Sequence, residues 1–420
     1  MMKERKNLLI ISVSIFMIGC SSLKYKEALW KKNKTFLSDN SFTGLLVINT
    51  KNGDTIINHN SKKYFTPASN TKIFTLYAAQ KVLPEKTPVL KYLFNNDTIY
   101  IQGTGDPTFL HPYYKDSTIL KFLKPYRNIV LNLTNYEGNK YGPGWAWEDY
   151  DASFSPEINS MPIYGNVTTV DGNTIVPNYF KDSLIPVKSK KRRALHENIF
   201  YLDSPSKDSL EVPFITSNTL IQKLLENALD KKIRLRDKMP YGLKSIVYGI
   251  PTDSLCKRML HESDNFIAEQ LLLLSSAMLS DTLNGDSLRN DVLKTYLPNL
   301  KQPPRWVDGS GLSRYNLFTP ESMVHVLHKI YNEIPKEKLF ALFPAGGASG
   351  TIKNMYKGNP NPYIYAKSGS LSNNYCLSGY LITKKSDTLI FSFMNNHFRL
   401  PSSKIKANVE LVLEKIRDMN

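Results

Sequence analysis

The chain has 420 residues, of which 41% are hydrophobic and 22% are charged, and its formal net charge is +17. A chain of this length can bury a large core and divide into more than one domain. The composition excludes a wholly disordered chain, and no segment has a collagen-like, Gln/Asn-rich or heptad pattern. The positive charge favours an anionic partner or surface.

The first twenty residues have the pattern of an export signal. Basic residues open the chain, an apolar run covers residues 8–18, and Gly19 stands directly before Cys20. The run is too short to span a bilayer comfortably, so we predict that residues 1–20 are a cleaved signal peptide. The Gly19–Cys20 pair resembles a bacterial lipoprotein cleavage site, although Met17 stands where leucine is usual. We therefore expect Cys20 to carry lipid and tether the protein to a membrane surface; an uncleaved anchor and a plain secretory signal are the alternatives.

After the predicted anchor, the first expected elements are a helix, a hairpin and a second helix. Residues 25–37 have helical apolar spacing. Residues 43–60 hold two strand-like runs around Asn52–Gly53, which is a strong hairpin signal. The loop before Ser69 then opens into an apolar helix over residues 69–82.

Residues 86–241 differ from the rest in being rich in Asn, Asp, Tyr, Pro and Gly, with short strand-like runs at 99–103 and 128–134. We predict that this region is a β-rich inserted domain. Its basic run at residues 188–193 (KSKKRR) is interpreted as a solvated loop. Export argues against nucleic acid as its partner, and an acidic envelope polymer is the alternative.

Helical periodicity returns over residues 252–279 and is followed by strand-like runs at 363–367, 376–383 and 388–394. An amphipathic helix closes the chain, with apolar residues at helical spacing: Ile405, Val409, Val412 and Ile416. This order predicts an α+β fold, with residues 21–85 and 242–420 forming one domain around the insertion.

Two cysteines, Cys256 and Cys376, remain beside Cys20. In an exported protein they either form a disulfide or stay as separate buried thiols, and the sequence favours neither. The chain has no CxxC pair and no His/Cys cluster, so no metal site is predicted.

The first candidate for catalysis is Ser69–Asn70–Thr71–Lys72. Positions three apart share one face of a helix, so the Ser69 hydroxyl and the Lys72 amine can meet. A serine needs a neighbouring base to act as a nucleophile, and burial lowers the pKa of a lysine until it can serve as that base. Taken alone the pattern is weak, because S-x-x-K recurs elsewhere in the chain and serine is a common helix N-cap.

Two further motifs follow. Ser263–Asp264–Asn265 lies between two apolar helical stretches, where the Ser263 hydroxyl can relay a proton and the Asn265 amide can hold a substrate carbonyl; a plain N-cap is the alternative. Lys367–Ser368–Gly369 ends a strand-like run. It offers a cation, a hydroxyl and a residue that lets another backbone approach, and a polar strand end is the alternative.

The three motifs in this order resemble the signature of serine penicillin-binding proteins and β-lactamases. The resemblance implies that Lys72 activates Ser69 and that Ser263 assists proton transfer. It also implies that Asn265 binds the substrate peptide.

The same resemblance implies a binding strand of Lys367, Ser368, Gly369 and Ser370. Lys367 and Ser368 would hold the terminal carboxylate of the substrate. The backbone N–H groups of Ser69 and Ser370 would form the oxyanion hole.

Four more segments are similar to those of the D-Ala-D-Ala carboxypeptidase/endopeptidase family, the class C low-molecular-mass penicillin-binding proteins: 103–108, 142–147, 308–314 and 350–353. The family implies the penicillin-binding protein/β-lactamase-like transpeptidase fold, in which helices flank an antiparallel sheet, with a helical subdomain and an insert between the first two motifs. The chain departs from the family at Ser368, where threonine is usual, and in its short insert.

We therefore predict a serine D,D-carboxypeptidase or D,D-endopeptidase that acts on D-Ala-D-Ala-type bonds of peptidoglycan peptide stems and is inhibited by β-lactams. It would need no cofactor, and it would face the periplasm as a lipoprotein on the outer membrane of a Gram-negative bacterium. One alternative is a β-lactamase-like hydrolase, which is disfavoured because no E-x-x-x-N pattern lies between residues 265 and 367. The other is a non-catalytic peptidoglycan-binding lipoprotein.

Overall fold

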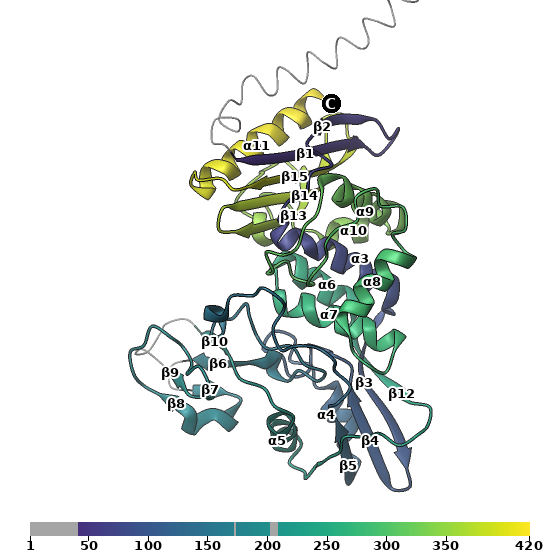
Figure 1. Cartoon of the computed structure of the whole chain (residues 1–420), viewed down its shortest axis with the longest axis vertical. Helices are drawn as coiled ribbons and strands as arrows, with labels where there is room; N and C mark the ends of the chain where they lie inside the picture. Colours follow the sequence, from purple (N-terminus) through teal and green to yellow (C-terminus); the bar gives the residue numbers. More distant parts are fainter. Residues whose placement is uncertain (1–40, 172–173, 202–208) are drawn as a thin grey trace, which may run out of the picture.

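The computed structural model describes residues 41–171, 174–201 and 209–420. The expected signal peptide, Cys20 and the helix expected at 25–37 lie outside these residues. Figure 1 shows an elongated molecule, with a sheet at one end, a layer of helices in the middle and a second sheet at the other end.

The first sheet joins strands from both ends of the described chain. Its order is β13 (Ile364–Leu371), β14 (Asn374–Ile382), β15 (Thr388–Asn396), β1 (Phe42–Asn49) and β2 (Thr55–His59), and all neighbours are antiparallel. The β1–β2 hairpin and the three later strands confirm the strands expected from the sequence. Within the described residues β13 is the edge strand of this sheet, with β14 as its one neighbouring strand, and Tyr365 at its start also forms a β-bridge with Ala345.

The two faces of this sheet are covered by different helices, because successive side chains of a strand point to opposite sides. Leu45 and Val47 pack with the C-terminal helix α11 (Ser402–Met419). Leu46, between them, packs on the opposite face with α3 (Lys72–Val82) and α9 (Pro320–Glu333). The amphipathic helix expected at the end of the chain is therefore confirmed as one cover of the sheet.

The helical layer in the middle of Figure 1 surrounds α3. A short 3₁₀ turn, η1 (Ala68–Thr71), leads into α3, whose first eight residues are all buried. A helix that is apolar nearly all round needs cover on every side. The cover comes from α9, α6 (Thr252–His261) and α7 (Asn265–Leu279). In the same hydrophobic core, α8 (Gly285–Thr295) packs on α7, and α10 (Lys336–Leu342) packs on α6 and α9.

The second five-stranded sheet has its own hydrophobic core. Its order is β11 (Arg234–Leu235), β5 (Asn128–Asn132), β4 (Thr98–Gly103), β3 (Lys86–Asn95) and β12 (Ser245–Pro251). β5 is parallel to β4 and β11, and the other pairs are antiparallel. Since β12 pairs with β3, this sheet extends past residue 241, and the domain division at that residue stays a prediction.

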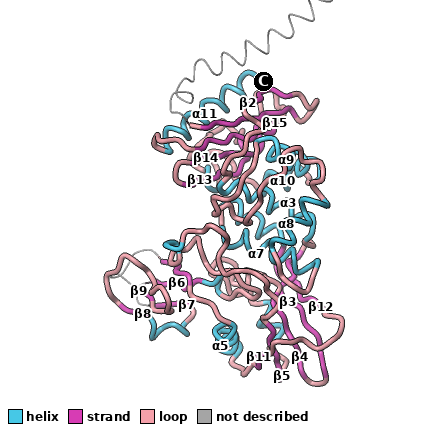
Figure 2. The backbone as a smooth tube through the Cα atoms, in the orientation of Figure 1, coloured by secondary structure: helices cyan, strands magenta, loops and turns pink. Residues whose placement is uncertain are grey.

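Smaller elements complete the insert, and Figure 2 shows that loops connect most of them. They are the helices α4 (Thr118–Leu123) and α5 (Asn218–Leu229); the 3₁₀ turns η2 (Trp147–Asp149), η3 (Tyr164–Asn166) and η4 (Asn178–Ser183); and the strands β6 (Val167–Asp171), β7 (Thr174–Val176), β8 (Leu184–Ile185), β9 (Phe200–Tyr201) and β10 (Leu210–Pro213). β10, β6 and β7 form one small sheet, and β8 and β9 another.

Arg193 corrects the interpretation of residues 188–193 as a solvated loop. The earlier residues of the run are exposed, but Arg193 is only 1% exposed. Its guanidinium donates to the carbonyls of Ala194 (2.8 Å) and Tyr150 (3.1 Å) and lies over the Tyr150 ring. These carbonyls replace water around the guanidinium, so the end of the run folds into the insert.

Cys256 and Cys376 are both buried free thiols, so the structure favours separate thiols over a disulfide. Burial raises the pKa of each thiol to about 12. Both side chains therefore act as small apolar groups of the core.

Candidate active site

Ser69 lies at the junction between a strained turn and a buried helix. The residue before it, Ala68, has a positive φ of 49°, which is unusual for a residue with a Cβ. Ser69 is partly exposed, and its backbone N–H is among the first of a helical segment, which have no intrahelical acceptor. The turn thus presents a hydroxyl together with an N–H that can stabilise negative charge.

Lys72 is fully buried and its ammonium group has three hydrogen-bond partners. The Nζ atom lies 3.0 Å from Ser69 Oγ and 2.7 Å from Asn265 Oδ1. It also lies 2.7 Å from the backbone carbonyl oxygen of Ser310. The structure therefore brings together the first motif and the asparagine of the second motif.

Burial lowers the pKa of Lys72 to about 8, because removal from water disfavours the charged form. The carboxylates of Asp308, Glu269 and Asp264 oppose this effect. The balance gives a lysine that exchanges its proton near neutral pH, as a general base must.

The second motif connects the site to the insert. The Asn265 amide donates to the backbone carbonyl of Phe154 (3.1 Å) while its oxygen accepts from Lys72. An amide has two N–H donors, so one remains for a substrate carbonyl. Ser263 lies in the turn between α6 and α7 with a φ of 57°, and no hydrogen bond joins its hydroxyl to Ser69 or Lys72 in the described part of the chain.

The third motif supplies a second buried lysine from the edge strand β13. Lys367 is fully buried and donates to the carbonyl of Ser368 (2.6 Å). Burial and then the charge of Lys72 hold the pKa of Lys367 well below its usual range. The Ser368 hydroxyl shares a hydrogen bond of 2.7 Å with Thr351, at the 3₁₀ turn η5 (Gly350–Ile352).

Two glycines allow the backbones around Ser69 to approach closely. A Cβ on Gly369 would lie 2.6 Å from the carbonyl oxygen of Pro67 and 2.9 Å from the backbone nitrogen of Ser69. A Cβ on Gly311, whose φ is 82°, would lie 1.9 Å from the carbonyl oxygen of Ala68. Strand β13 and the loop after Asp308 therefore both press against the serine turn. Ser370, the next residue of the strand, is exposed.

The sequence prediction missed two contributors to the environment of Lys72. Ser310 contributes a backbone carbonyl, which no side-chain pattern reveals, although it lies in the segment 308–314 that resembles the family. Glu269 is a buried carboxylate on α7 that accepts from the backbone N–H groups of Gly309 and Ser310. A glutamate within a largely apolar, buried helix was the signal that could have identified it.

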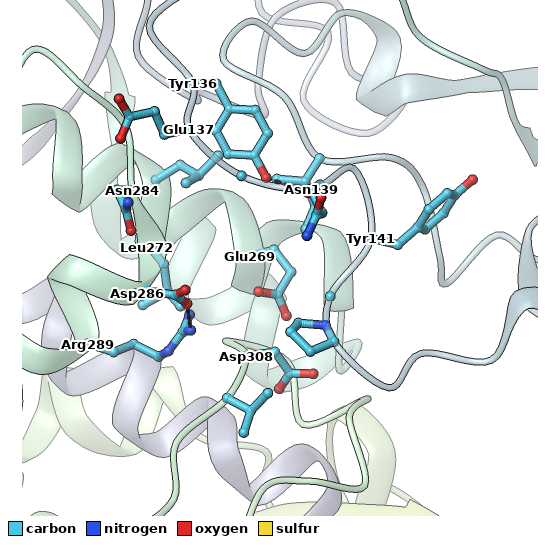
Figure 3. Close-up of a pocket in the computed structure, with 17 residues that line it drawn as sticks. Tyr136, Glu137, Asn139, Tyr141, Glu269, Leu272, Asn284, Asp286, Arg289 and Asp308 are labelled. Atoms are coloured by element: carbon cyan, nitrogen blue, oxygen red, sulfur yellow. Dashed lines mark hydrogen bonds and ion pairs between the residues drawn. The ribbon is translucent and has the colours of Figure 1, made fainter.

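A cavity of about 120 Å³ lies beside these buried acids (Figure 3). Glu269 and Asp308 project toward it from the peptidase side, and Tyr136 and Asn139 line it from the insert. Arg289, on α8, lines the same cavity and is paired with Asp286. No group of three or more His, Cys, Asp or Glu side chains that could hold a metal occurs among residues 41–171, 174–201 and 209–420.

An α+β fold that gathers S-x-x-K, S-x-N and K-[ST]-G motifs around one serine defines the class of penicillin-binding proteins and related serine hydrolases. The sequence profile of the D-Ala-D-Ala carboxypeptidase 3 (S13) family matches residues 34–191 and 245–416. The chain belongs to this family and is a hydrolase of the D-Ala-D-Ala carboxypeptidase type. The predicted family and fold class are thereby confirmed.

Individual relatives agree with this assignment. The D-alanyl-D-alanine carboxypeptidase DacB of Haemophilus influenzae is 26% identical over 417 residues, covering 86% of this chain and 87% of the relative. The penicillin-sensitive carboxypeptidase A of Dictyostelium discoideum is 23% identical, covering 81% and 80%. Penicillin binding protein 4 (dacB) of H. influenzae has a solved structure with the same fold, with a TM-score of 0.72 at 20% identity, covering 91% of this chain and 97% of that one.

Proposed function

We propose that the chain hydrolyses D-Ala-D-Ala-type bonds of peptidoglycan peptide stems through an acyl-enzyme on Ser69. The observation that carries the proposal is the set of contacts around Lys72 Nζ. Two of its partners, Asn265 Oδ1 and the Ser310 carbonyl, can only accept hydrogen bonds. A neutral amine has two N–H groups and one lone pair, so both N–H groups are taken and the lone pair is left for the Ser69 hydroxyl.

This arrangement makes neutral Lys72 the base that removes the proton of Ser69. The fraction of neutral lysine rises as the pH rises through its pKa of about 8. The acylation rate is therefore expected to rise with pH from pH 6, to reach half of its maximum near pH 8, and to level off from about one pH unit above that value.

Lys367 is proposed to bind the terminal carboxylate of the substrate. Burial disfavours its charge, and an incoming carboxylate would restore it, because an opposite charge at close range favours the ionised form. The charge on Lys367 in turn disfavours the charge on Lys72, since each ammonium repels the other.

The proposed reaction has two stages. Ser69 Oγ attacks the carbonyl carbon, its proton passes to Lys72, and N–H groups of Ser69 and Ser370 stabilise the oxyanion. The C–N bond then breaks, Ser263 relays a proton to the leaving amine, and the acyl group stays on Ser69. Water hydrolyses this ester and releases the shortened peptide.

The contacts of Glu269 argue against fast β-lactam hydrolysis. Both of its carboxylate oxygens accept backbone N–H groups, at 2.7 Å and 2.9 Å. It is therefore poorly placed to activate a deacylating water. We expect a β-lactam to form a long-lived adduct, so that such drugs act as inhibitors.

We also propose that lipid on Cys20 anchors the protein at a membrane facing the periplasm. Cys20 lies outside the described residues, and the support comes from the export signal and the adjoining Gly19. In the described part of the chain, no helix is long and apolar enough to cross a bilayer. Metabolic labelling with a radioactive fatty acid, compared between wild type and Cys20→Ala, tests the anchor.

The catalytic proposal is tested by mass spectrometry of the purified protein after incubation with a penicillin. We expect one covalent adduct in the wild type and none in Ser69→Ala. Released D-alanine from a pentapeptide should fall by roughly 10⁴-fold or more in the variant, as for the loss of other catalytic serines. Wild-type protein that forms no adduct and releases no D-alanine would contradict the proposal.

A further inference from the structure

The loop that contacts Lys72 is held by two buried carboxylates. Glu269 Oε1 accepts from the backbone N–H of Ser310 (2.7 Å), and Oε2 accepts from that of Gly309 (2.9 Å). The carbonyl of the same Ser310 accepts from Lys72 Nζ. One residue, Ser310, therefore connects the Glu269 carboxylate to the Lys72 amine, through its backbone N–H on one side and its carbonyl on the other.

Asp308 holds the other side of this loop. Its Oδ1 accepts from the backbone N–H of Gly311 (2.8 Å) and from the Asn316 amide (2.7 Å). Its Oδ2 accepts from the backbone N–H of Ser313 (2.7 Å) and from the indole N–H of Trp145 (3.0 Å). The carboxylate thus organises the loop and connects it to the insert.

Neither carboxylate forms an ion pair within the described residues. Arg289 is the cation that acts on Glu269, but its guanidinium is bound to Asp286 and to the carbonyl of Trp306. Figure 3 shows the Arg289 side chain directed to Asp286, apart from Glu269 and Asp308. The charges of the two acids are therefore available to act on Lys72.

We propose that Glu269 and Asp308 are positioning residues that set the protonation state of Lys72, in addition to holding the Ser310 carbonyl in place. The inference rests on the proposed function, because it concerns the base of that reaction. Their negative charges favour protonated Lys72 and so raise the pH at which the neutral base appears.

Several other charged groups surround Lys72 and Glu269. Lys367 on β13 and Asp264, which precedes α7, act on Lys72 with opposite signs. Arg289 on α8 acts on Glu269, as does Asp308, and the Tyr136 hydroxyl of the insert is close enough to respond to its charge. Burial raises the pKa of Glu269 to about 7, so this carboxylate gains its charge in the same pH range in which Lys72 loses its own.

The test is the pH dependence of penicillin acylation in the wild type and in Glu269→Gln. The variant keeps the shape of the side chain and removes its charge. Because an amide nitrogen cannot accept, one of the two backbone N–H groups of Gly309 and Ser310 also loses its acceptor. We expect the acid limb of the rate profile to move to lower pH by about one unit, the size of shift that a neighbouring opposite charge produces. Stopped-flow fluorescence with a labelled penicillin measures the profile.

Two matched variants separate charge from geometry. Glu269→Asp keeps the charge but shortens the reach to Gly309 and Ser310, so its plateau rate should fall while its acid limb stays near that of the wild type. Glu157→Gln removes another buried carboxylate, which pairs with Lys140 in the insert, and should leave the limb unmoved.

The results distinguish an effect of the Glu269 charge on Lys72 from a role in holding the loop alone. A lower rate in Glu269→Gln with an unmoved acid limb means that the carboxylate only holds the loop, and this overturns the inference. Asp308→Asn provides the same measurement if Glu269→Gln does not fold. A wild type that forms no adduct at any pH overturns the proposed function instead.

Discussion

The two sides of the active site are built in different ways. The peptidase side supplies the proposed reacting groups as side chains on or beside buried elements, namely Ser69, Lys72 and Lys367. The insert contacts the site at two points. The backbone carbonyl of Phe154 accepts from the Asn265 amide, and the indole N–H of Trp145 donates to Asp308. From this difference we expect the proposed chemistry to depend on the close-packed part of the molecule and the insert to adjust the geometry of the site.

The packing around the site also differs between the peptidase side and the insert side. Around Ser69, a single added methyl at Gly311 or Gly369 would collide with backbone atoms. In the insert, Trp147 is 76% exposed, only two residues from the indole that contacts Asp308. Tightly packed groups keep a fixed geometry, whereas loops tolerate change.

The strongest test of this comparison removes the proposed base. Lys72→Met keeps most of the side-chain volume and should lower the penicillin acylation rate by about 10²–10⁴-fold, the usual contribution of a general base. Lys81→Met, at the other end of the same helix, removes a lysine that pairs with Glu333 at the surface and should change the rate less than about twofold. An active Lys72→Met enzyme would mean that the base lies elsewhere.

The close packing can be tested with two glycines of similar φ. Gly311→Ala places a Cβ 1.9 Å from a backbone oxygen and should lower the free energy of unfolding by more than about 3 kcal/mol. In Gly53→Ala nothing lies within 4 Å of the added Cβ, so only the unfavourable positive φ destabilises the variant. The free energy of unfolding should then fall by only about 1–2 kcal/mol. Urea unfolding measures both, and equal losses would contradict the packing argument.

The contribution of the insert is expected to be smaller. Trp145→Phe removes one hydrogen bond to Asp308, worth about 1.5–3 kcal/mol for a charged acceptor, and should slow acylation by roughly tenfold. Trp147→Phe changes an exposed ring on the same loop and serves as the control. If both variants acylate at the wild-type rate, the insert does not support the catalytic loop.

The smallest effect on catalysis is expected in the basic run of the insert. Lys190→Glu reverses an exposed charge and should leave pentapeptide turnover within about twofold of the wild type. Arg193→Met, in contrast, removes the hydrogen bonds to the partly buried carbonyls of Ala194 and Tyr150 and should lower the free energy of unfolding by about 1–3 kcal/mol. A large loss of turnover in Lys190→Glu would indicate that the run contacts the substrate.

The sequence predicted the features whose signal lies in side-chain spacing. Asn52–Gly53 identified the β1–β2 hairpin, and the structure gives Gly53 the positive φ that such a turn requires. The spacing of Ser69 and Lys72 likewise predicted their contact. These features are local, so neighbouring residues are enough to specify them.

The features that sequence did not predict depend on contacts between distant segments. The Ser310 carbonyl reaches Lys72 only because the fold brings α3 and the 308–314 loop together. The burial of Arg193 depends on carbonyls that side-chain charge does not reveal. The pairing of β12 with β3 likewise depends on residues far apart in the sequence.

The strand order of the first sheet also has a consequence for how the enzyme folds. β1 lies beside β15, with Phe42 opposite Asn396, so one of the first described strands finds its partner among the last. Pairing of such distant segments is slow, and it requires nearly the whole polypeptide. A growing chain therefore lacks the complete sheet during synthesis, and the proposed active site is assembled only once the final strands have closed it.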